Sequence, residues 1–411
     1  MMRTTDEIDI GRILRISRRG TEIQGSPIRK LSAIAEARKK TGVHVHHLNI
    51  GQPDLPTSPA VFQAIRSFDR KTIAYAPSNG IPEAVSAWKR YLGTHRIDFD
   101  ERELIVTSGG SEAIIFALCA VCDAGDEVIV FEPFYTNYNG FASVANVKLK
   151  AVALSIENGF HLPSRETIEA AVTPRTRAIL FCNPSNPTGT IYSREEVQRL
   201  VDIAVERNLF LLSDEVYREF AYETKAVGIT EFPEVRGQAI LLDSCSKRFN
   251  VCGARIGLLA SHNDDVVQAA LKFGMARLSV ATIEQFAVAP LLNDPLPYTT
   301  PIVDEFRKRR DVVYQGLGTI PEVRYYKPEG AFYIVIGLPV DDAENFSKWL
   351  IEKFEYQKET VLLAPGPGFY ATPGKGKNEV RLAFMLNADD LRKSLAILKR
   401  ALEVYDRTGT N

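Results

Sequence analysis

One lysine in the sequence stands where it could act as a nucleophile. Lys247 lies in SCSKRFNVCGARIG (244–257), at the end of the apolar run AILLDSCS, and Arg255 follows it by eight positions. An amine near the edge of a sheet can be desolvated, which favours its neutral, nucleophilic form. Most single lysines are solvated or paired with an acid such as Asp243, so the role of Lys247 depends on its neighbours.

Three further polar stretches follow apolar runs or enter helices in the same way. They are TSGGSEA (107–113), a glycine-bearing turn, NPSNPTG (183–189), with two Asn-Pro pairs, and DEVY (214–217), an acid after LFLLS. A helix N-terminus suits a phosphate, and a buried carboxylate needs a cation or a hydrogen-bond donor. Each stretch alone is compatible with an ordinary turn, but together they indicate one site.

These residue types match the requirements of pyridoxal phosphate. Its aldehyde needs an amine for a Schiff base (Lys247), and its pyridine nitrogen needs an anion to stay protonated (Asp214). Its phenolate oxygen needs donors such as Asn186 and Tyr217. Its phosphate needs a helix N-terminus, hydroxyls and a planar cation. The candidates for the phosphate are Gly109, Gly110, Ser111, Ser244, Ser246 and Arg255.

The elements that must position these side chains form a regular pattern. Short apolar runs between residues 103 and 261 are separated by longer segments, some with helical spacing. This pattern predicts an α/β fold with a mainly parallel sheet, whose strand ends carry the ligand groups. Two of the covering helices are expected over 111–122 and 193–207, and the second opens with a Ser-Arg-Glu-Glu capping box.

The pattern changes near residue 300. A charged helix (301–317), the strand AFYIVIGLP, a helix over 343–354, a Gly/Pro-rich loop and VRLAFML predict a smaller α+β unit. A helical stretch at 26–42 is expected to pack against this unit. We therefore predict a large domain over 52–300 and a discontinuous small domain formed by 1–51 and 301–411.

Composition argues against several classes of protein. A chain of 411 residues exceeds what one hydrophobic core usually organises. Lys plus Arg (50) nearly balances Asp plus Glu (51), which argues against a nucleic-acid-binding protein. No apolar run approaches the roughly 20 residues that span a bilayer, and the start MMRTTDEIDIGR lacks a signal-peptide core. We expect a cytoplasmic protein without disulfides that binds neither nucleic acid nor membrane.

The order of the motifs carries a resemblance to a known family. LNIGQPDLPTSP, YAPSNGIPE, VTSGGSEA, FEPFYTNY, NPSNPTG, SDEVY, SCSKRFNVCGARIG and EVRLAFML follow one another over nearly the whole chain. The chain resembles the class I/II aminotransferases of the aspartate-aminotransferase superfamily, which are fold-type I pyridoxal-phosphate enzymes. The resemblance implies a mainly parallel seven-stranded sheet sandwiched by helices, a smaller α+β domain and pyridoxal 5'-phosphate as cofactor.

The resemblance also implies roles for single residues. Lys247 matches the lysine that forms the Schiff base and moves the substrate proton, and Asp214 matches the partner of the pyridine nitrogen. Asn186 and Tyr217 match the donors to the phenolate oxygen. Tyr135, in FEPFYTNY, matches the position whose aromatic ring stacks on the cofactor. Some relatives have Trp there, and either ring can stack.

Further matched residues concern the substrate and the phosphate. Arg381 matches the arginine that binds the substrate α-carboxylate, and Gly51, with Asn186, lies where that group is contacted. Tyr75 resembles the tyrosine that reaches the phosphate of the neighbouring subunit, which implies a homodimer. Without the order of these motifs, we would interpret Arg381 as a charge at the edge of a strand and Tyr75 as an ordinary tyrosine in a turn. The matched phosphate positions are Gly109, Gly110, Ser244 and Arg255.

The expected function is transfer of an amino group from an L-amino acid to a 2-oxo acid such as 2-oxoglutarate. Aspartate aminotransferase is the best single label, although some bacterial members have a lysine at the position of Ser111, so aromatic and aliphatic donors stay open. A pyridoxal-phosphate-dependent carbon-sulfur β-lyase is the alternative. A non-catalytic effector-sensing module is disfavoured, because no basic helix-turn-helix is evident.

Two patterns resemble metal sites and are expected to be structural. HVHH (44–47) would place alternate residues on opposite faces of a strand, and no carboxylate follows nearby. Cys119 and Cys122 form C-x-x-C inside an apolar helix without a second pair for zinc. We expect core cysteines and no metal.

Overall fold

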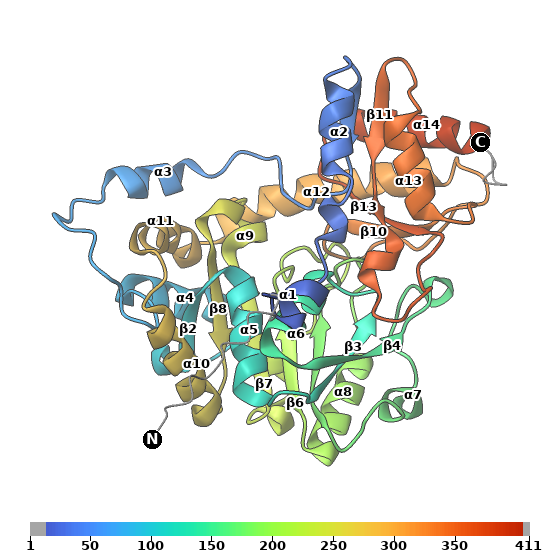
Figure 1. Cartoon of the computed structure of the whole chain (residues 1–411). Coiled ribbons are helices and arrows are strands. Elements are labelled where there is room, and N and C mark those ends of the chain that lie inside the picture. Colours follow the sequence, from blue (N-terminus) through green and yellow to red (C-terminus); the bar gives the residue numbers. More distant parts are fainter. Residues whose placement is uncertain (1–13, 406–411) are drawn as a thin grey trace, which may run out of the picture.

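The computed structural model describes residues 14–405 (Figure 1). The polar start of the chain, on which the expectation about a signal peptide rests, lies outside these residues. So do the outermost parts of the predicted small domain. Within residues 14–405, no helix is long and apolar enough to cross a bilayer.

A seven-stranded sheet forms the centre of the molecule. Its strands, in spatial order, are β2 (Leu104–Ser108), β8 (Ile256–Ala260), β7 (Ala239–Ser244), β6 (Phe210–Asp214), β5 (Thr176–Cys182), β3 (Glu127–Glu132) and β4 (Lys148–Ala153). Neighbouring strands are parallel, except that β8 is antiparallel to both β2 and β7. The prediction of a mainly parallel, seven-stranded α/β sheet is confirmed.

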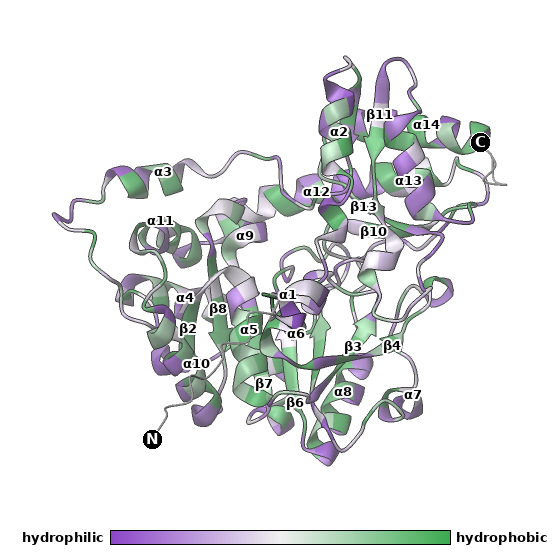
Figure 2. Cartoon of the chain, in the orientation of Figure 1, coloured by the Kyte–Doolittle hydropathy of each residue, from purple (hydrophilic) through white to green (hydrophobic). Residues whose placement is uncertain are grey.

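Helices cover both faces of this sheet. They are α4 (Pro82–Thr94), α5 (Gly109–Val121), α6 (Asn137–Ala145), α8 (Arg194–Arg207), α10 (Asp264–Arg277) and α11 (Thr282–Asn293). In β3, Val128 and Val130 pack with α5, α6 and α10, whereas Ile129 and Phe131 pack with α8. The helices α4 and α11 cover the second face beside β2 and β8. Burial on both faces explains why the inner strands are mostly apolar, whereas the edge strand β4 is partly exposed and carries Lys148 and Lys150 (Figure 2).

One of the two covering helices expected from the sequence begins at its predicted capping box, and the other begins two residues early. The Ser193 hydroxyl accepts from the backbone N–H of Glu196, whose carboxylate accepts in turn from the backbone N–H of Ser193, so the predicted capping box starts α8. Helix α5 starts at Gly109, two residues before the predicted Ser111. Its N-terminus therefore lies directly at the end of β2.

The C-terminal part forms a second β structure with part of the N-terminal segment. Its strands are β1 (His44–His47), β9 (Arg324–Tyr325), β10 (Tyr333–Gly337), β11 (Glu359–Leu362), β12 (Ala364–Pro365) and β13 (Glu379–Ala383). Its helices are α2 (Ser32–Lys39), α12 (Leu296–Leu317), α13 (Ala343–Glu352) and α14 (Ala388–Val404). The order β12-β13-β10-β9 is antiparallel, and β1 pairs in parallel with β11. This is the smaller α+β unit that the sequence predicts.

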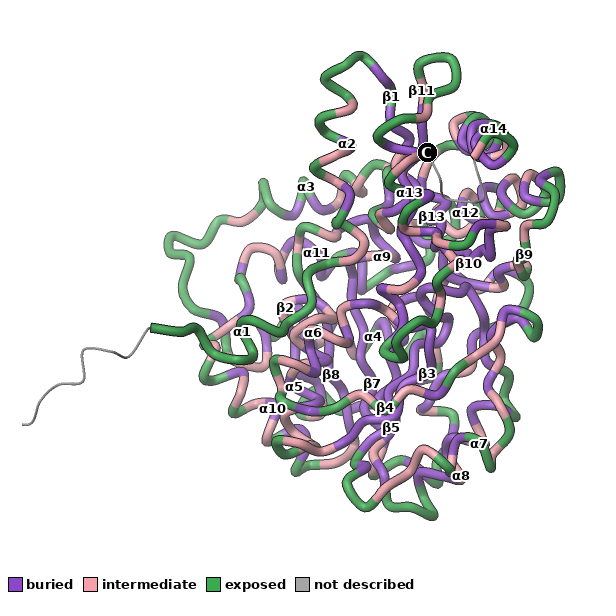
Figure 3. Tube along the Cα trace, turned by 45° about the vertical axis from the view of Figure 1, so that its right-hand side comes forward, coloured by how far each residue is buried: buried purple, intermediate pink, exposed green. Residues whose placement is uncertain are grey.

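Some predicted limits differ from the structure. The helix expected over 26–42 is divided into a 3-10 turn (Pro27–Arg29) and α2, and the helix expected from Pro301 begins at Leu296. The expected domain boundary at residue 300 therefore falls inside α12, and the division into domains stays a prediction. Three short helices complete this list: α1 (Arg18–Glu22) precedes α2, α3 (Pro59–Arg66) lies between β1 and α4, and α7 (Arg165–Glu169) lies between β4 and β5. Figure 3 shows that α1 and much of α3 are exposed.

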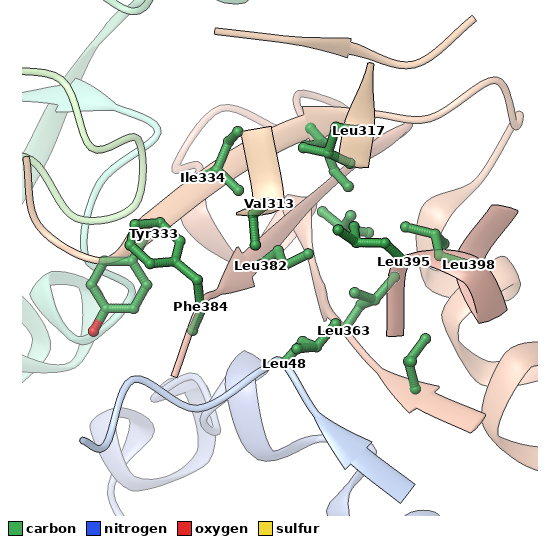
Figure 4. Close-up of a cluster of buried hydrophobic side chains, with 14 of the residues drawn as sticks. Leu48, Val313, Leu317, Tyr333, Ile334, Leu363, Leu382, Phe384, Leu395 and Leu398 are labelled. Carbon is green, nitrogen blue, oxygen red and sulfur yellow. The ribbon is translucent and has the colours of Figure 1, made fainter. Parts of the chain in front are cut away.

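One hydrophobic cluster joins the two β structures (Figure 4). Ile334 and Leu382 of the smaller sheet pack in the same cluster as Leu48, which follows β1. Tyr217 and Phe220, which follow β6, belong to it as well. The smaller unit is therefore fixed against the carboxyl ends of the central strands, where ligands bind in open α/β sheets.

The two metal-like patterns have other partners. His44–His47 form β1, and His46 Nε2 lies 2.9 Å from Glu359 Oε2 of β11. Because Glu359 is 313 positions away from His46, the sequence near HVHH could not predict this contact. No group of three or more His, Cys, Asp or Glu within residues 14–405 could hold a metal. Cys119 and Cys122 are half-buried at the C-terminal end of α5, and Cys122 packs against the hydrophobic cluster between this helix and the central sheet.

Candidate active site

Lys247 projects from a single helical turn, α9 (Cys245–Arg248), that begins at the end of β7. The Ser244 hydroxyl caps this turn by accepting from the backbone N–H of Ser246. The half-buried Lys247 donates from Nζ to the carbonyl of Gly51, at 2.7 Å, and lies 3.9 Å from Cys252 Sγ. The amine is therefore held between the end of the central sheet and the segment that follows β1.

Asp214 ends β6 as a buried carboxylate. Tyr138 Oη donates to its Oδ2 at 2.8 Å, and the backbone N–H of Val216 donates to its Oδ1 at 3.4 Å. Burial raises the pKa of Asp214 to about 6, against these two donors. The carboxylate thus has the hydrogen-bond donors that its position requires but no cationic partner among the groups acting on it.

Arg381, in β13, is a buried guanidinium with a free donor. Its NH1 donates to Asn186 Oδ1 at 3.1 Å and its NH2 to the carbonyl of Asn49 at 2.6 Å, while its Nε has no partner. Burial lowers its pKa, and the groups that act on it electrostatically are tyrosines, not carboxylates. A buried cation in such surroundings is costly unless an anion binds it. The site is therefore suited to a ligand carboxylate.

Asn186 and Tyr217 lie together beside Arg381. Asn186 Nδ2 donates to Tyr217 Oη at 3.3 Å, and Tyr217 Oη lies 3.0 Å from Tyr333 Oη. Burial raises the pKa of Tyr217 well above its ordinary value, so the hydroxyl keeps its proton. The turn NPSNPTG and the segment DEVY thus bring two hydrogen-bonding groups to one place, as the sequence predicts.

The N-terminus of α5 lies against Arg255 and strand β8, and we call this region the cradle. A Cβ on Gly109, whose φ is +72°, would lie 2.3 Å from Arg255 NH2, and a Cβ on Gly257 would lie 2.4 Å from the carbonyl carbon of Gly109. Glycine is required at both positions, because the guanidinium and strand β8 approach the backbone this closely. Backbone N–H groups and a planar cation at a helix N-terminus suit a phosphate.

Three serines adjoin this cradle. Ser244 Oγ donates to Ser246 Oγ at 2.8 Å, and a Cβ on Gly110 would lie 3.7 Å from Ser244 Cβ. Ser111 occupies the first turn of α5 and is half-buried. All the phosphate candidates named from the sequence are thus near the ends of β2, β7 and β8.

The two predicted tyrosines differ in their placement. Tyr135 is half-buried, its hydroxyl accepts from Asn137 Nδ2 at 2.9 Å, and its ring meets that of Tyr138 edge-on at 5.6 Å. Burial raises its pKa, with further contributions from Tyr333 and Asp214, so it lies with the other site residues. Tyr75 is 81% exposed. No hydrogen bond or ring contact within residues 14–405 joins it to the site of its own chain.

Several residues of the site are not apparent from the sequence. Tyr138 lies three positions after Tyr135 and ends the motif FEPFYTNY, but the motif does not single it out. Asn49 and Cys252 lie inside the motifs LNIGQPD and SCSKRFNVCGARIG but contribute a carbonyl and a thiol that the motifs do not single out. Tyr333 belongs to AFYIVIGLP, a run that predicts only a strand.

Comparison with known proteins identifies the family. The sequence profile of the family "Aminotransferase class I and II" matches residues 43–397. The chain is 32% identical over 397 residues to the probable aspartate aminotransferase of Methanocaldococcus jannaschii, covering 94% of this chain and 100% of that protein. It is 32% identical over 383 residues to the aspartate aminotransferase of Thermotoga maritima, covering 92% and 97%. A single mutant of Thermus thermophilus aspartate aminotransferase has a similar structure, with a TM-score of 0.86 at 29% identity over 95% of this chain and 100% of that one.

The fold agrees with this assignment, since the mainly parallel seven-stranded sheet carries the lysine, the acid and the glycine turn at its strand ends. The chain therefore belongs to the class I and II aminotransferase family and is an aminotransferase of fold type I.

Proposed function

We propose that the chain is a pyridoxal-phosphate-dependent aminotransferase in which Lys247 holds the cofactor covalently. One observation carries this proposal: an amine lies with two buried charged groups that lack a counter-charge. Asp214 has no cationic partner, and Arg381 has a free Nε and no carboxylate partner. A pyridinium ring and a substrate carboxylate would supply the missing charges.

The donor set fits the cofactor. Asp214 would keep the ring nitrogen protonated, Tyr135 would stack on the ring, and Asn186 with Tyr217 would donate to the phenolate oxygen. When bound, the cofactor supplies a sink for electrons withdrawn from the substrate Cα. The N-terminus of α5 would hold the phosphate, together with Gly109, Gly110, Ser111, Ser244, Ser246 and Arg255.

The protein's own residues would orient the substrate and move one proton. Arg381 would bind the α-carboxylate through its guanidinium, beside Asn186 and the backbone at Gly51. A charge-assisted contact of this kind contributes about 1.5 to 3 kcal/mol and fixes the orientation of the ligand. The Lys247 amine would then take the Cα proton as general base and return it as general acid.

We propose an L-amino acid as donor and a 2-oxo acid such as 2-oxoglutarate as acceptor. Aspartate is the first donor to test, because the relatives named above are called aspartate aminotransferases. Some relatives have a lysine at the position of Ser111 that helps to hold a second carboxylate. Because this chain has a serine there, aromatic and aliphatic amino acids should be tested as donors as well.

We also propose a homodimer in which Tyr75 of each chain completes the phosphate site of the other. The high exposure of Tyr75 supports this, as does Ile73, a large apolar side chain that is 66% exposed two positions earlier. Exposed apolar side chains that gather in one segment are typical of protein interfaces.

Turnover with and without an acceptor tests the proposed activity. L-aspartate and 2-oxoglutarate should yield oxaloacetate and glutamate, and omission of the acceptor should stop steady turnover. Lys247→Ala should lower kcat by at least about 100-fold, whereas Lys272→Ala, at an exposed lysine of α10, should not. Sustained release of pyruvate and ammonia from cystathionine without acceptor would instead establish the β-lyase.

A further inference from the structure

Tyr333 connects the smaller unit to the candidate site. It begins β10, is 2% exposed and lies at the edge of the hydrophobic cluster, with its hydroxyl turned away from the leucine side chains (Figure 4). That hydroxyl lies 3.0 Å from Tyr217 Oη. It also fills the space beside Gly51, since a Cβ there would lie 1.9 Å from Tyr333 Oη. The tyrosine thus touches both Tyr217 and the Gly51 segment whose carbonyl accepts from Lys247.

The hydrogen bonds around it have a defined direction, because arginine can only donate. Arg381 NH1 donates to the amide of Asn186, so the atom that faces Arg381 must be Oδ1. The other end of the same amide, Nδ2, therefore donates to Tyr217 Oη. Arg381 in this way fixes Tyr217 as an acceptor toward Asn186.

The Tyr217 hydroxyl has one proton and can accept two hydrogen bonds. One acceptor position is taken by Asn186, and the contact to Tyr333 can use either the second acceptor position or the proton itself. If Tyr333 donates, the proton of Tyr217 is free for a ligand. If Tyr217 donates to Tyr333, no proton remains for a ligand oxygen.

We propose that Tyr333 is a positioning residue whose hydroxyl donates to Tyr217, so that the single proton of Tyr217 is directed at the phenolate oxygen of the cofactor. This inference rests on the proposed function. An anionic ligand oxygen selects the arrangement in which both Asn186 and Tyr333 donate to Tyr217. Hydrogen bonds in such a chain strengthen one another, so Tyr333 makes Tyr217 a stronger donor.

The ring of Tyr333 has a second effect. The guanidinium carbon of Arg381 lies 4.3 Å from the centre of the Tyr333 ring and 5.0 Å from that of Phe369. Since no carboxylate acts on Arg381, these rings and two carbonyl oxygens are what hold it. Tyr333 therefore keeps the guanidinium in place, with Nε free, before a carboxylate arrives.

Two substitutions separate the two effects. Tyr333→Phe removes the hydroxyl and keeps the ring, whereas Tyr333→Leu removes both. Tyr222→Phe is the control, because the buried Tyr222 hydroxyl also makes one hydrogen bond, to the carbonyl of Ala331. The first readout is the pH midpoint of the absorption band of bound pyridoxal phosphate. The second is the Kd of an unreactive carboxylate, maleate, or 3-phenylpropanoate if maleate does not bind the wild type.

Tyr333→Phe should raise the pH midpoint by roughly 0.3 to 0.6 units, because the phenolate anion loses part of its stabilisation. Its carboxylate Kd should stay within about twofold of wild type. Tyr333→Leu should raise the midpoint similarly and also weaken carboxylate binding by about 3- to 10-fold. Tyr222→Phe should match wild type in both measurements.

The proposed roles of the hydroxyl and of the ring would be contradicted by different results. An unchanged midpoint in Tyr333→Phe would refute the hydroxyl's role, and equal carboxylate affinities in the Phe and Leu variants would refute the ring's role. The Phe variant tests the hydroxyl even if the Leu variant does not fold. A wild-type protein that binds pyridoxal phosphate without any absorption band from a Lys247 bond would overturn the proposed function and this inference together.

Discussion

The buried carboxylate of Asp214 destabilises the ligand-free protein at neutral pH. Its pKa of about 6 lies well above the ordinary value of 3.8, because burial disfavours the charged form. This difference corresponds to about 3 kcal/mol. Because the folded pKa is the higher one, the associated stability is present at low pH and is lost as the pH rises through about 6.

Asp214→Asn should therefore stabilise the cofactor-free protein at pH 8 by up to about 3 kcal/mol and have little effect at pH 4. The amide oxygen can still accept from Tyr138, so the gain comes from removing a buried charge. Urea unfolding at the two pH values measures the difference, with Asp98→Asn at an exposed site as control. The prediction fails if the Asn variant is no more stable than wild type at pH 8.

At the scale of elements, α9 depends on a buried ion network. This single turn is too short to be stable by itself. The side chain of Arg248 is fully buried, contacts the Asp243 carboxylate and lies 3.1 Å from Glu219. Arg218, next to Tyr217, lies 3.3 Å from the same Asp243. One carboxylate at the end of β7 thus joins the turn that carries Lys247 to the segment that carries Tyr217.

Arg248→Met should lower the free energy of unfolding by about 3 to 5 kcal/mol, because Asp243 and Glu219 would remain buried without this cation. Arg392→Met is the matched control. It removes an exposed arginine that pairs with Asp389 in α14 and should cost no more than about 0.5 kcal/mol. Denaturant unfolding of the cofactor-free proteins compares the two. Equal costs would contradict the role given to the buried network.

The sequence predicts the parts of the site that follow strands more completely than the parts that contact across the fold. Lys247, Asp214 and Asn186 each follow an apolar run, and parallel strands bring such ends to one edge. Tyr138 and Tyr333 act on partners 76 and 116 positions away, and the sequence around them, FEPFYTNY and AFYIVIGLP, indicates neither contact. Local periodicity cannot supply such contacts. The roles of Arg381 and Gly51 came from the family resemblance, not from spacing.

At the scale of the whole molecule, the proposed dimer makes a prediction about complementation. Tyr75→Ala and Lys247→Ala should each inactivate the enzyme or weaken it strongly. If Tyr75 serves the partner's site, a mixed dimer contains one site with both Lys247 and Tyr75 intact. After unfolding and refolding of an equal mixture, about a quarter of the sites should be intact.

Specific activity of the refolded mixture measures this recovery, with each variant refolded alone as control. If Tyr75 acted within its own chain, mixing would create no intact site, and the activity would equal the average of the two variants. Sedimentation of the refolded protein reports separately whether dimers form, so a folding defect is distinguishable from a misassigned role for Tyr75.

Arg381 donates to Asn186 and to the carbonyl of Asn49, which lie 195 and 332 positions earlier in the chain. During synthesis the central sheet and Lys247 emerge well before this arginine does. A growing polypeptide stopped at residue 380 would carry the amine of Lys247 and the N-terminus of α5, but not the guanidinium that we propose binds the substrate carboxylate. The proposed carboxylate site is therefore completed only after the whole central sheet has been synthesised, and a fragment that ends before residue 381 lacks it.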